Sequence, residues 1–145
     1  MKVKNRHIIL DDELIKLDDV VMIDVAQAGS PFENARFYLN VVYDDGSSRE
    51  IDIIEDRVRL RVMKQLNTIG KVINDSGMNN FVNIDFALVN MDNLKSIKYI
   101  KKEGKIEIVS LRGYINSFKA SPNQAKHSID KLEDAYDKYM QSRVQ

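Results

Sequence analysis

The residue types that most often carry chemistry are sparse in this 145-residue chain. Cysteine is absent, so a disulfide framework, a thiolate metal site and a cysteine nucleophile are all excluded. The two histidines, His7 and His127, lie in different predicted elements, whereas a zinc site takes three or four ligands at set spacings. The sequence therefore predicts no metal site and no other cofactor.

Carboxylates, glycines and serines show no catalytic arrangement either. Adjacent aspartates occur at 11–12, 18–19 and 44–45, beside predicted strands or in a predicted turn, where aspartate is common. The six glycines are scattered singly, so there is no glycine-rich loop for a phosphate group. No serine has a histidine and an acid in a recognisable motif around it. We therefore expect a protein that binds a partner and is not an enzyme.

Positive charge is concentrated in one segment, residues 95–119, although the whole chain has 22 Lys/Arg and 22 Asp/Glu. The acidic residues of this segment are Glu103 and Glu107. Its basic residues are Lys95, Lys98, Lys101, Lys102, Lys105, Arg112 and Lys119. A local basic segment on a neutral protein is either an electrostatic footprint for nucleic acid or the solvated face of a hairpin. The charge pattern alone is compatible with both.

Hydrophobic periodicity predicts that these residues are positioned by one α+β domain over 1–145, rich in short, mostly antiparallel strands. Period-2 alternation and short apolar runs predict strands in the first half at 7–10, 20–25, 37–43 and 50–54, with a loop at 26–31 and an Asp-Gly turn at 44–47. The same patterns predict strands in the second half at 81–84, 88–91, 97–100, 106–111 and 114–118.

Apolar residues spaced by three and four predict one internal helix over 57–74, with Asp56 as its N-cap. Ser-Pro-Asn-Gln at 121–124 predicts the capping box of a C-terminal helix over 122–141.

The C-terminal helix has a wide apolar stripe that ends in Tyr136, Tyr139 and Met140. The stripe either closes the core or forms the seam of a homodimer.

A short internal echo suggests a duplication. The segment 14–20 (Leu-Ile-Lys-Leu-Asp-Asp-Val) matches 88–94 (Leu-Val-Asn-Met-Asp-Asn-Leu) at an offset of 74, and each half ends in a predicted helix. This pattern is compatible with a strand-rich unit that is followed by a helix and occurs twice.

Three segments carry a resemblance to a known family. They are 15–20 (Ile-Lys-Leu-Asp-Asp-Val), 43–46 (Tyr-Asp-Asp-Gly) and 81–94, in which Leu-Val-Asn-Met-Asp is the best match. In this order they resemble the opening strand, the hairpin and the later Val-Asn-Leu-Asp segment of LytTR-type DNA-binding domains of bacterial transcriptional regulators. The resemblance spans about 14–120.

The resemblance implies a DNA-binding transcriptional regulator of bacterial or mobile-element origin, with double-stranded DNA as its partner. Family members contact DNA from loops at one edge of the sheets, through a His/Arg/Ser cluster and a later Ser-x-Arg. Here Asn83, Asp85, Phe86 and Ala87 occupy the first cluster, and either 117–119 or 121–123 occupies the second.

Asn83 or Asn90 is then the candidate for reading a base edge, and the alternative for Asn90 is that it satisfies a turn. The candidates for phosphate contacts are Lys95, Lys98, Lys101, Lys102, Lys105 and Lys119. Because most cations of the family motifs are replaced, the competing hypothesis is a non-enzymatic protein-binding or structural module on the same fold.

Membrane insertion and secretion are not predicted. The apolar run at 8–10 is too short for a signal peptide, and no stretch approaches the roughly 18 apolar residues of a membrane span. We expect a cytoplasmic protein with no membrane partner.

Overall fold

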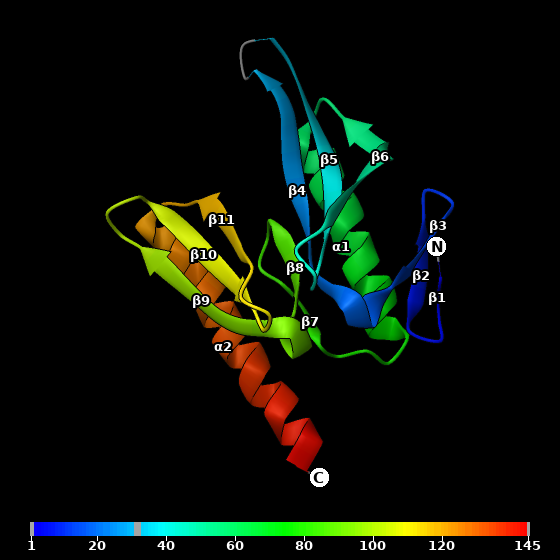
Figure 1. Cartoon of the computed structure of the whole chain (residues 1–145), viewed down its shortest axis with the longest axis vertical. Helices are drawn as coiled ribbons and strands as arrows, with labels where there is room; N and C mark the ends of the chain where they lie inside the picture. Colours follow the sequence, from blue (N-terminus) through cyan, green and yellow to red (C-terminus); the bar gives the residue numbers. More distant parts are fainter. Residues whose placement is uncertain (1, 31–32, 145) are drawn as a thin grey trace.

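Three antiparallel sheets and two α-helices make up the fold (Figure 1). The structure, a computed structural model, describes residues 2–30 and 33–144, without the side chains at 30, 33–34, 52–55 and 142–144. Within the described residues there are eleven strands, two α-helices and two 3₁₀ helices. The predicted strand-rich α+β fold with one internal and one C-terminal helix is confirmed.

The elements follow one another in two similar series. The first contains β1 (Val3–Lys4), β2 (His7–Leu10), β3 (Glu13–Lys16), the 3₁₀ helix η1 (Leu17–Asp19), β4 (Val20–Ser30), β5 (Glu33–Tyr43), β6 (Ser48–Asp56) and α1 (Arg59–Asp75). The second contains β7 (Phe81–Asn83), β8 (Ala87–Asn90), the 3₁₀ helix η2 (Met91–Asn93), β9 (Leu94–Ile100), β10 (Lys105–Ser110), β11 (Ile115–Lys119) and α2 (Pro122–Val144).

The strand orders are β1-β2-β3, β6-β5-β4-β8-β7 and β11-β10-β9. The central five-stranded sheet joins the two halves of the chain, because β8 pairs antiparallel with β4. In Figure 1 the β9–β11 sheet and α2 lie on the left, and the β1–β3 sheet lies on the right. The strands β3 and β9 are therefore edge strands on opposite sides of the molecule.

Helix α1 covers one face of the central sheet. Its buried residues are those of the predicted stripe, Val62, Leu66, Ile69 and Ile73, and they share a core cluster with Ile23 of β4. Burying an aliphatic side chain of this size contributes about 1.5–3 kcal/mol. Burial of this stripe is therefore a main contribution to holding α1 on the sheet.

Helix α2 and the β9–β11 sheet form a second core against the opposite face. Ile106 and Ile108 of β10 and Leu132 of α2 are buried in this cluster. The helix begins at the predicted capping box: the Gln124 amide donates to Ser121 Oγ at 3.2 Å, and the Ser121 amide donates to Gln124 Oε1 at 2.9 Å.

Two boundary predictions are wrong. The predicted loop at 26–31 is strand at 26–30, because β4 remains paired with β5 up to Ser30. The register shifts next to Gly29, whose φ is 83°, so this glycine marks a bulge within a strand; position 31 lies outside the described residues. The Asp56 carboxylate accepts a hydrogen bond from the Val58 amide at 2.9 Å, before α1 begins, and is therefore not the N-cap.

The hairpins of the β1–β3 sheet have turns that the sequence pattern does not reveal. Asn5 and Arg6 have φ values of 52° and 62°, and Asp11 and Asp12 have φ values of 52° and 58°. Positive φ at both central residues is the requirement of a type I′ turn, and aspartate and asparagine tolerate it better than most residues. Because neither turn contains a glycine, β1 and β3 were not predicted.

Among the described helices, none is both long and apolar enough to cross a bilayer.

Candidate nucleic-acid interface

The predicted phosphate-binding lysines lie on the β9–β11 sheet and in its turns. Lys105 of β10 stands directly opposite Lys119 of β11, which places the two side chains on one face. The exposed Lys101 and Lys102 form the turn between β9 and β10, and this turn lies at the same end as Lys119. Lys98 is opposite Glu107, further along β9.

Two of these lysines already have acidic partners. Lys105 Nζ lies 2.7 Å from a Glu103 carboxylate oxygen and 3.9 Å from Glu107, and the hydrogen bond to Glu103 raises the pKa of Lys105. Lys98 Nζ lies 3.8 Å from Glu107. Lys98 and Glu103 are largely exposed, whereas the Lys105 and Glu107 side chains are 30% and 14% exposed. Ion pairs that face solvent contribute at most about 1 kcal/mol. Phosphate can therefore replace the exposed Glu103 carboxylate at little cost.

The remaining cations of the set are free of such partners. Within the described residues, Lys95, Lys101, Lys102 and Lys119 form no ion pair. Their charge is available to an external anion.

A hollow of about 460 Å³ lies beside Lys119, between the first turns of α1 and α2. Its wall includes Arg59 of α1, His127 of α2 and the ring pair Phe86 and Phe118. The centroids of these two rings are 4.8 Å apart at an interplanar angle of 48°. The structure thus brings the segments 84–86 and 117–120 together at one edge of the sheets, although they are distant in sequence.

Asp85 is the acidic residue of this hollow, and its charge is compensated by α2. Its backbone has φ of 82°, a left-handed conformation. His127 Nε2 lies 3.0 Å from Asp85 Oδ2, and Lys131 Nζ lies 3.0 Å from Asp85 Oδ1. The negative charge of Asp85 therefore has basic neighbours that come from another element.

The side chain of Asn83 is used within the fold. Its Nδ2 donates to Asn67 Oδ1 on α1 at 2.6 Å, and its Oδ1 accepts from the Asp85 amide at 2.7 Å. The second bond closes an Asx turn, which supports the left-handed Asp85. Both ends of the Asn83 amide therefore hold the 83–85 turn against α1.

Three residues of this edge were missed as site candidates: Arg59, His127 and Lys131. The sequence places Arg59 on the polar side of a helix, where a solvated face is the ordinary explanation. Only the fold, which places the start of α1 and the start of α2 at one hollow, brings it near Lys119. The positive ends of both helix dipoles also lie there, which favours an anion.

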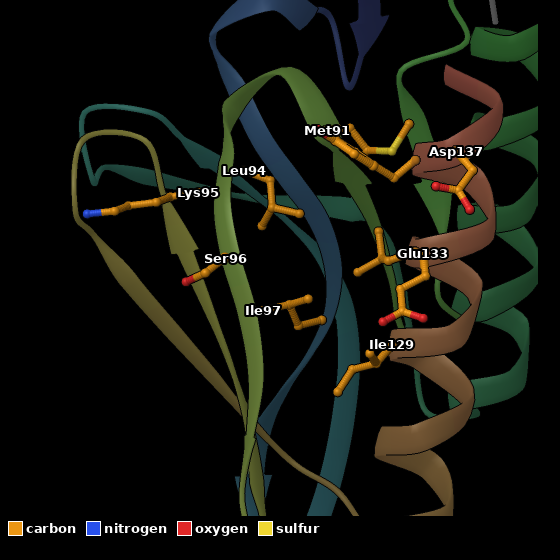
Figure 2. A pocket seen from close by; sticks show the side chains of 10 residues that line it. Met91, Leu94, Lys95, Ser96, Ile97, Ile129, Glu133 and Asp137 are labelled. Carbon is orange, nitrogen blue, oxygen red and sulfur yellow. The ribbon is translucent and has the colours of Figure 1, made fainter. Parts of the chain in front are cut away.

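A second hollow, which we call the β9 groove, separates β9 from α2. It has a volume of about 540 Å³. Figure 2 shows Leu94 and Ile97 of β9 facing Ile129 of α2 across it, with the carboxylates of Glu133 and Asp137 on the helix side. The groove is therefore apolar within and acidic along the α2 rim.

Within the described residues, no group of His, Asp or Glu side chains could hold a metal ion. Comparison with known protein families, with curated proteins and with solved structures finds no match to this chain.

Proposed function

We propose that this protein is a transcriptional regulator that binds double-stranded DNA along a basic edge. The basic edge consists of Arg59, Lys101, Lys102, Lys105 and Lys119. The observation that supports it is the convergence of cations from three separate segments: the β9–β10 turn, the end of β11 and the start of α1.

The geometry suits phosphate groups better than a small acidic ligand. The Ala120 amide donates to the Gly104 carbonyl at 3.0 Å, which ties the β9–β10 turn to the end of β11. Arg59 and Lys119 line the hollow, whereas the other three cations lie outside its lining, so the set is spread over one edge and not gathered in one pocket. Each lysine or arginine that neutralises a phosphate releases condensed counterions, and this release supplies most of the sequence-independent affinity for DNA.

The test is a fluorescence anisotropy titration of random and promoter duplexes at several salt concentrations. The triple substitution Lys101→Ala, Lys102→Ala and Lys119→Ala is expected to weaken binding to all sequences alike. It should also flatten the salt dependence by about 0.9 log units per lost contact. The charge-matched control is Lys71→Ala, Arg112→Ala and Lys138→Ala, which removes cations distant from the basic edge and should bind like the unaltered protein.

Two results would count against the proposal. No binding at tens of micromolar protein in low salt would remove the DNA function. An equal loss in the control variant would show that general charge, and not the basic edge, is responsible.

A protein-binding module is the second candidate, and the β9 groove favours it. Apolar walls beside a strand edge are the features that bind an extended segment of another chain. If the titration detects no DNA binding, this function takes the place of the first.

A further inference from the structure

The chain contains two copies of one structural unit, 7–75 and 81–144. Each unit is a two-stranded hairpin, a 3₁₀ turn, a three-stranded meander and a helix. The hairpins have the same register at an offset of 74: Ile8 pairs with Ile15 in the first unit, and Val82 pairs with Val89 in the second.

Backbone hydrogen bonds outside the strands repeat as well. The Leu17 amide donates to the Arg6 carbonyl at 3.0 Å, and 74 residues further on the Met91 amide donates to the Asn80 carbonyl at 2.8 Å. The turns at 43–47 and 110–114 share their bonds at an offset of 67, which is smaller because the β4–β5 hairpin is longer than β9–β10. The short sequence echo therefore belongs to a repeat that covers most of the chain.

The two units are joined because the hairpin of the second fills a groove in the first. The strand β8 adds to β4, with Leu88 opposite Ile23. The Leu88 side chain, which is 1% exposed, lies against α1: a Cβ atom on Gly70 would be 2.8 Å from Leu88 Cδ2. Leu88 thus enters the space between β4 and α1.

The equivalent space in the second unit is the β9 groove, and it is open. At an offset of 63, the buried α1 stripe at 62, 66, 69 and 73 corresponds to positions 125, 129, 132 and 136 of α2. The last three of these α2 positions line the groove. Tyr136 is 52% exposed, whereas its counterpart Ile73 is fully buried. Beside the groove, β9 has no strand on its outer edge within the described residues.

The complementary surface is present on the other side of the molecule. At the offset of 74, the counterpart of Leu88 is Leu14 of β3, which is 63% exposed. Its cross-strand neighbour Ile9 is 58% exposed. The strand β3 is an edge strand, as β8 would be without β4.

Charge also matches between the two surfaces. The row next to Leu14 on the same face contains Lys4, His7 and Lys16, which are cross-strand neighbours. The α2 rim of the β9 groove contains Glu133 and Asp137, and Lys95 belongs to the lining on the β9 side. A basic row beside an exposed leucine therefore faces an acidic rim beside an apolar groove.

We propose that a second copy of this chain occupies the β9 groove. Its β3 adds antiparallel to β9, as β8 adds to β4 within one chain, and its Leu14 lies opposite Ile97. The basic row of Lys4, His7 and Lys16 on that copy then lies toward Asp137 of the first copy. The interface repeats one that the fold already contains, with the same strand register and the same apolar residue in the groove.

This association is head to tail. The two surfaces differ and lie on opposite sides of the molecule, so each added copy presents a new open groove or a new open strand (Figure 1). Such a heterologous contact gives a ring or a filament, whereas a twofold seam between α2 helices stops at a dimer.

Sedimentation velocity of the full chain over a concentration series tests the proposal. The mass is expected to increase past that of a dimer as concentration rises. Leu14→Asp and Tyr136→Glu each remove one surface, so each variant alone should remain monomeric. Leu60→Asp on α1, at another exposed leucine, is the matched control and should assemble like the unaltered chain.

A one-to-one mixture of the two variants provides the decisive result. Leu14→Asp keeps its groove and Tyr136→Glu keeps its β3 surface, so the mixture should form a heterodimer that does not grow further. Circular dichroism checks that each variant is folded, and Ile9→Asp is a second variant of the β3 surface.

Three results would each overturn the head-to-tail contact. They are a monomer at hundreds of micromolar, a mass that stops at the dimer for the unaltered chain, and a variant mixture that stays monomeric.

Discussion

The two strand–helix grooves of this protein have the same construction and different contents. Between β4 and α1, the groove is filled by β8, and Leu88 is buried against Gly70. Between β9 and α2, the groove is open, and Tyr136 remains exposed. The difference indicates that the β7–β8 hairpin belongs to two cores: one face completes its own unit, and the other covers the groove of the first unit.

The faces of the β2–β3 hairpin show the same division. Ile8 and Ile15 point inward and are buried in the first core, while Ile9 and Leu14 point outward and are exposed. In the second unit the outward position is buried as well, because the first unit stands beside it. Burial of a leucine contributes about 1.5–3 kcal/mol, so the uncovered face represents a sizeable unused stabilisation.

The largest expected difference in the free energy of unfolding is between truncation of Leu88 and truncation of its counterpart Leu14. Leu88→Ala should lower the free energy of unfolding by about 2–5 kcal/mol, because it removes buried atoms and leaves a cavity between β4 and α1. Leu14→Ala should change it by less than about 0.5 kcal/mol in dilute solution, where no second copy covers it. Urea unfolding at low protein concentration measures both. Equal losses would show that the two positions are not in different environments.

The next comparison concerns a buried carboxyl on β4, at the groove that β8 fills. Asp24 lies on β4 opposite Ala87 of β8 and is 7% exposed, and one of its oxygens has no hydrogen-bond partner among the described residues. Burial raises its pKa from 3.8 to about 6. Its counterpart at the offset of 74 is the exposed Lys98.

A raised carboxyl pKa means that the folded state binds the proton more tightly than the unfolded state. The cost of the charged Asp24 is therefore fully present above pH 6 and is relieved as pH falls through 6 toward 3.8. Asp24→Asn should raise the free energy of unfolding near neutral pH by up to about 3 kcal/mol, and the gain should disappear in acid. Thermal melts over a pH series measure it.

Asp45→Asn is the control with the opposite sign. Hydrogen bonds from Ser47 lower the pKa of Asp45, so its contribution to stability is present at neutral pH and is lost in acid. A destabilising Asp24→Asn at neutral pH would contradict the assignment of Asp24 as a costly buried charge.

The smallest expected difference in stability concerns Gly70 of α1, which lies against Leu88. Alanine normally stabilises a helix relative to glycine by about 1 kcal/mol, but at Gly70 its Cβ would overlap Leu88. Gly70→Ala should therefore destabilise by about 1–3 kcal/mol, and it should become neutral or stabilising when combined with Leu88→Ala. Glu133→Ala at the counterpart on α2 should have an effect within about 0.5 kcal/mol, because the groove there is open. A double-mutant cycle in urea gives the coupling.

Much of the fold was predictable because its signals are local. The capping box at 121–124, the helical stripe at 62–73 and the Asp-Gly turn at 44–47 each depend on neighbouring residues, and each is present. The errors arose where a residue type has two structural uses. Gly29 marks a bulge inside a strand, and Asp11 and Asp12 form a tight turn without glycine.

The candidate site was predictable only in part, for a related reason. The basic segment 95–119 is contiguous in sequence, so its lysines were found. Arg59 and His127 join Lys119 only because the fold places the starts of α1 and α2, which are 63 positions apart in sequence, at one hollow, and no pattern in either helix indicates it. Asn83 was a candidate for base recognition, and its bonds to Asn67 and Asp85 are visible only in three dimensions.

Residues 14–20 and 88–94 show most clearly what the local sequence determines and what the tertiary structure decides. Their shared pattern is enough to specify the same local path, a strand, a 3₁₀ turn and another strand, because backbone conformation follows from nearby residue types. The same pattern cannot specify burial, since burial depends on what stands beside the strand. Leu14 and Leu88 occupy equivalent positions in equivalent hairpins, and it is the presence of β4 and α1 next to β8 that buries one and leaves the other exposed.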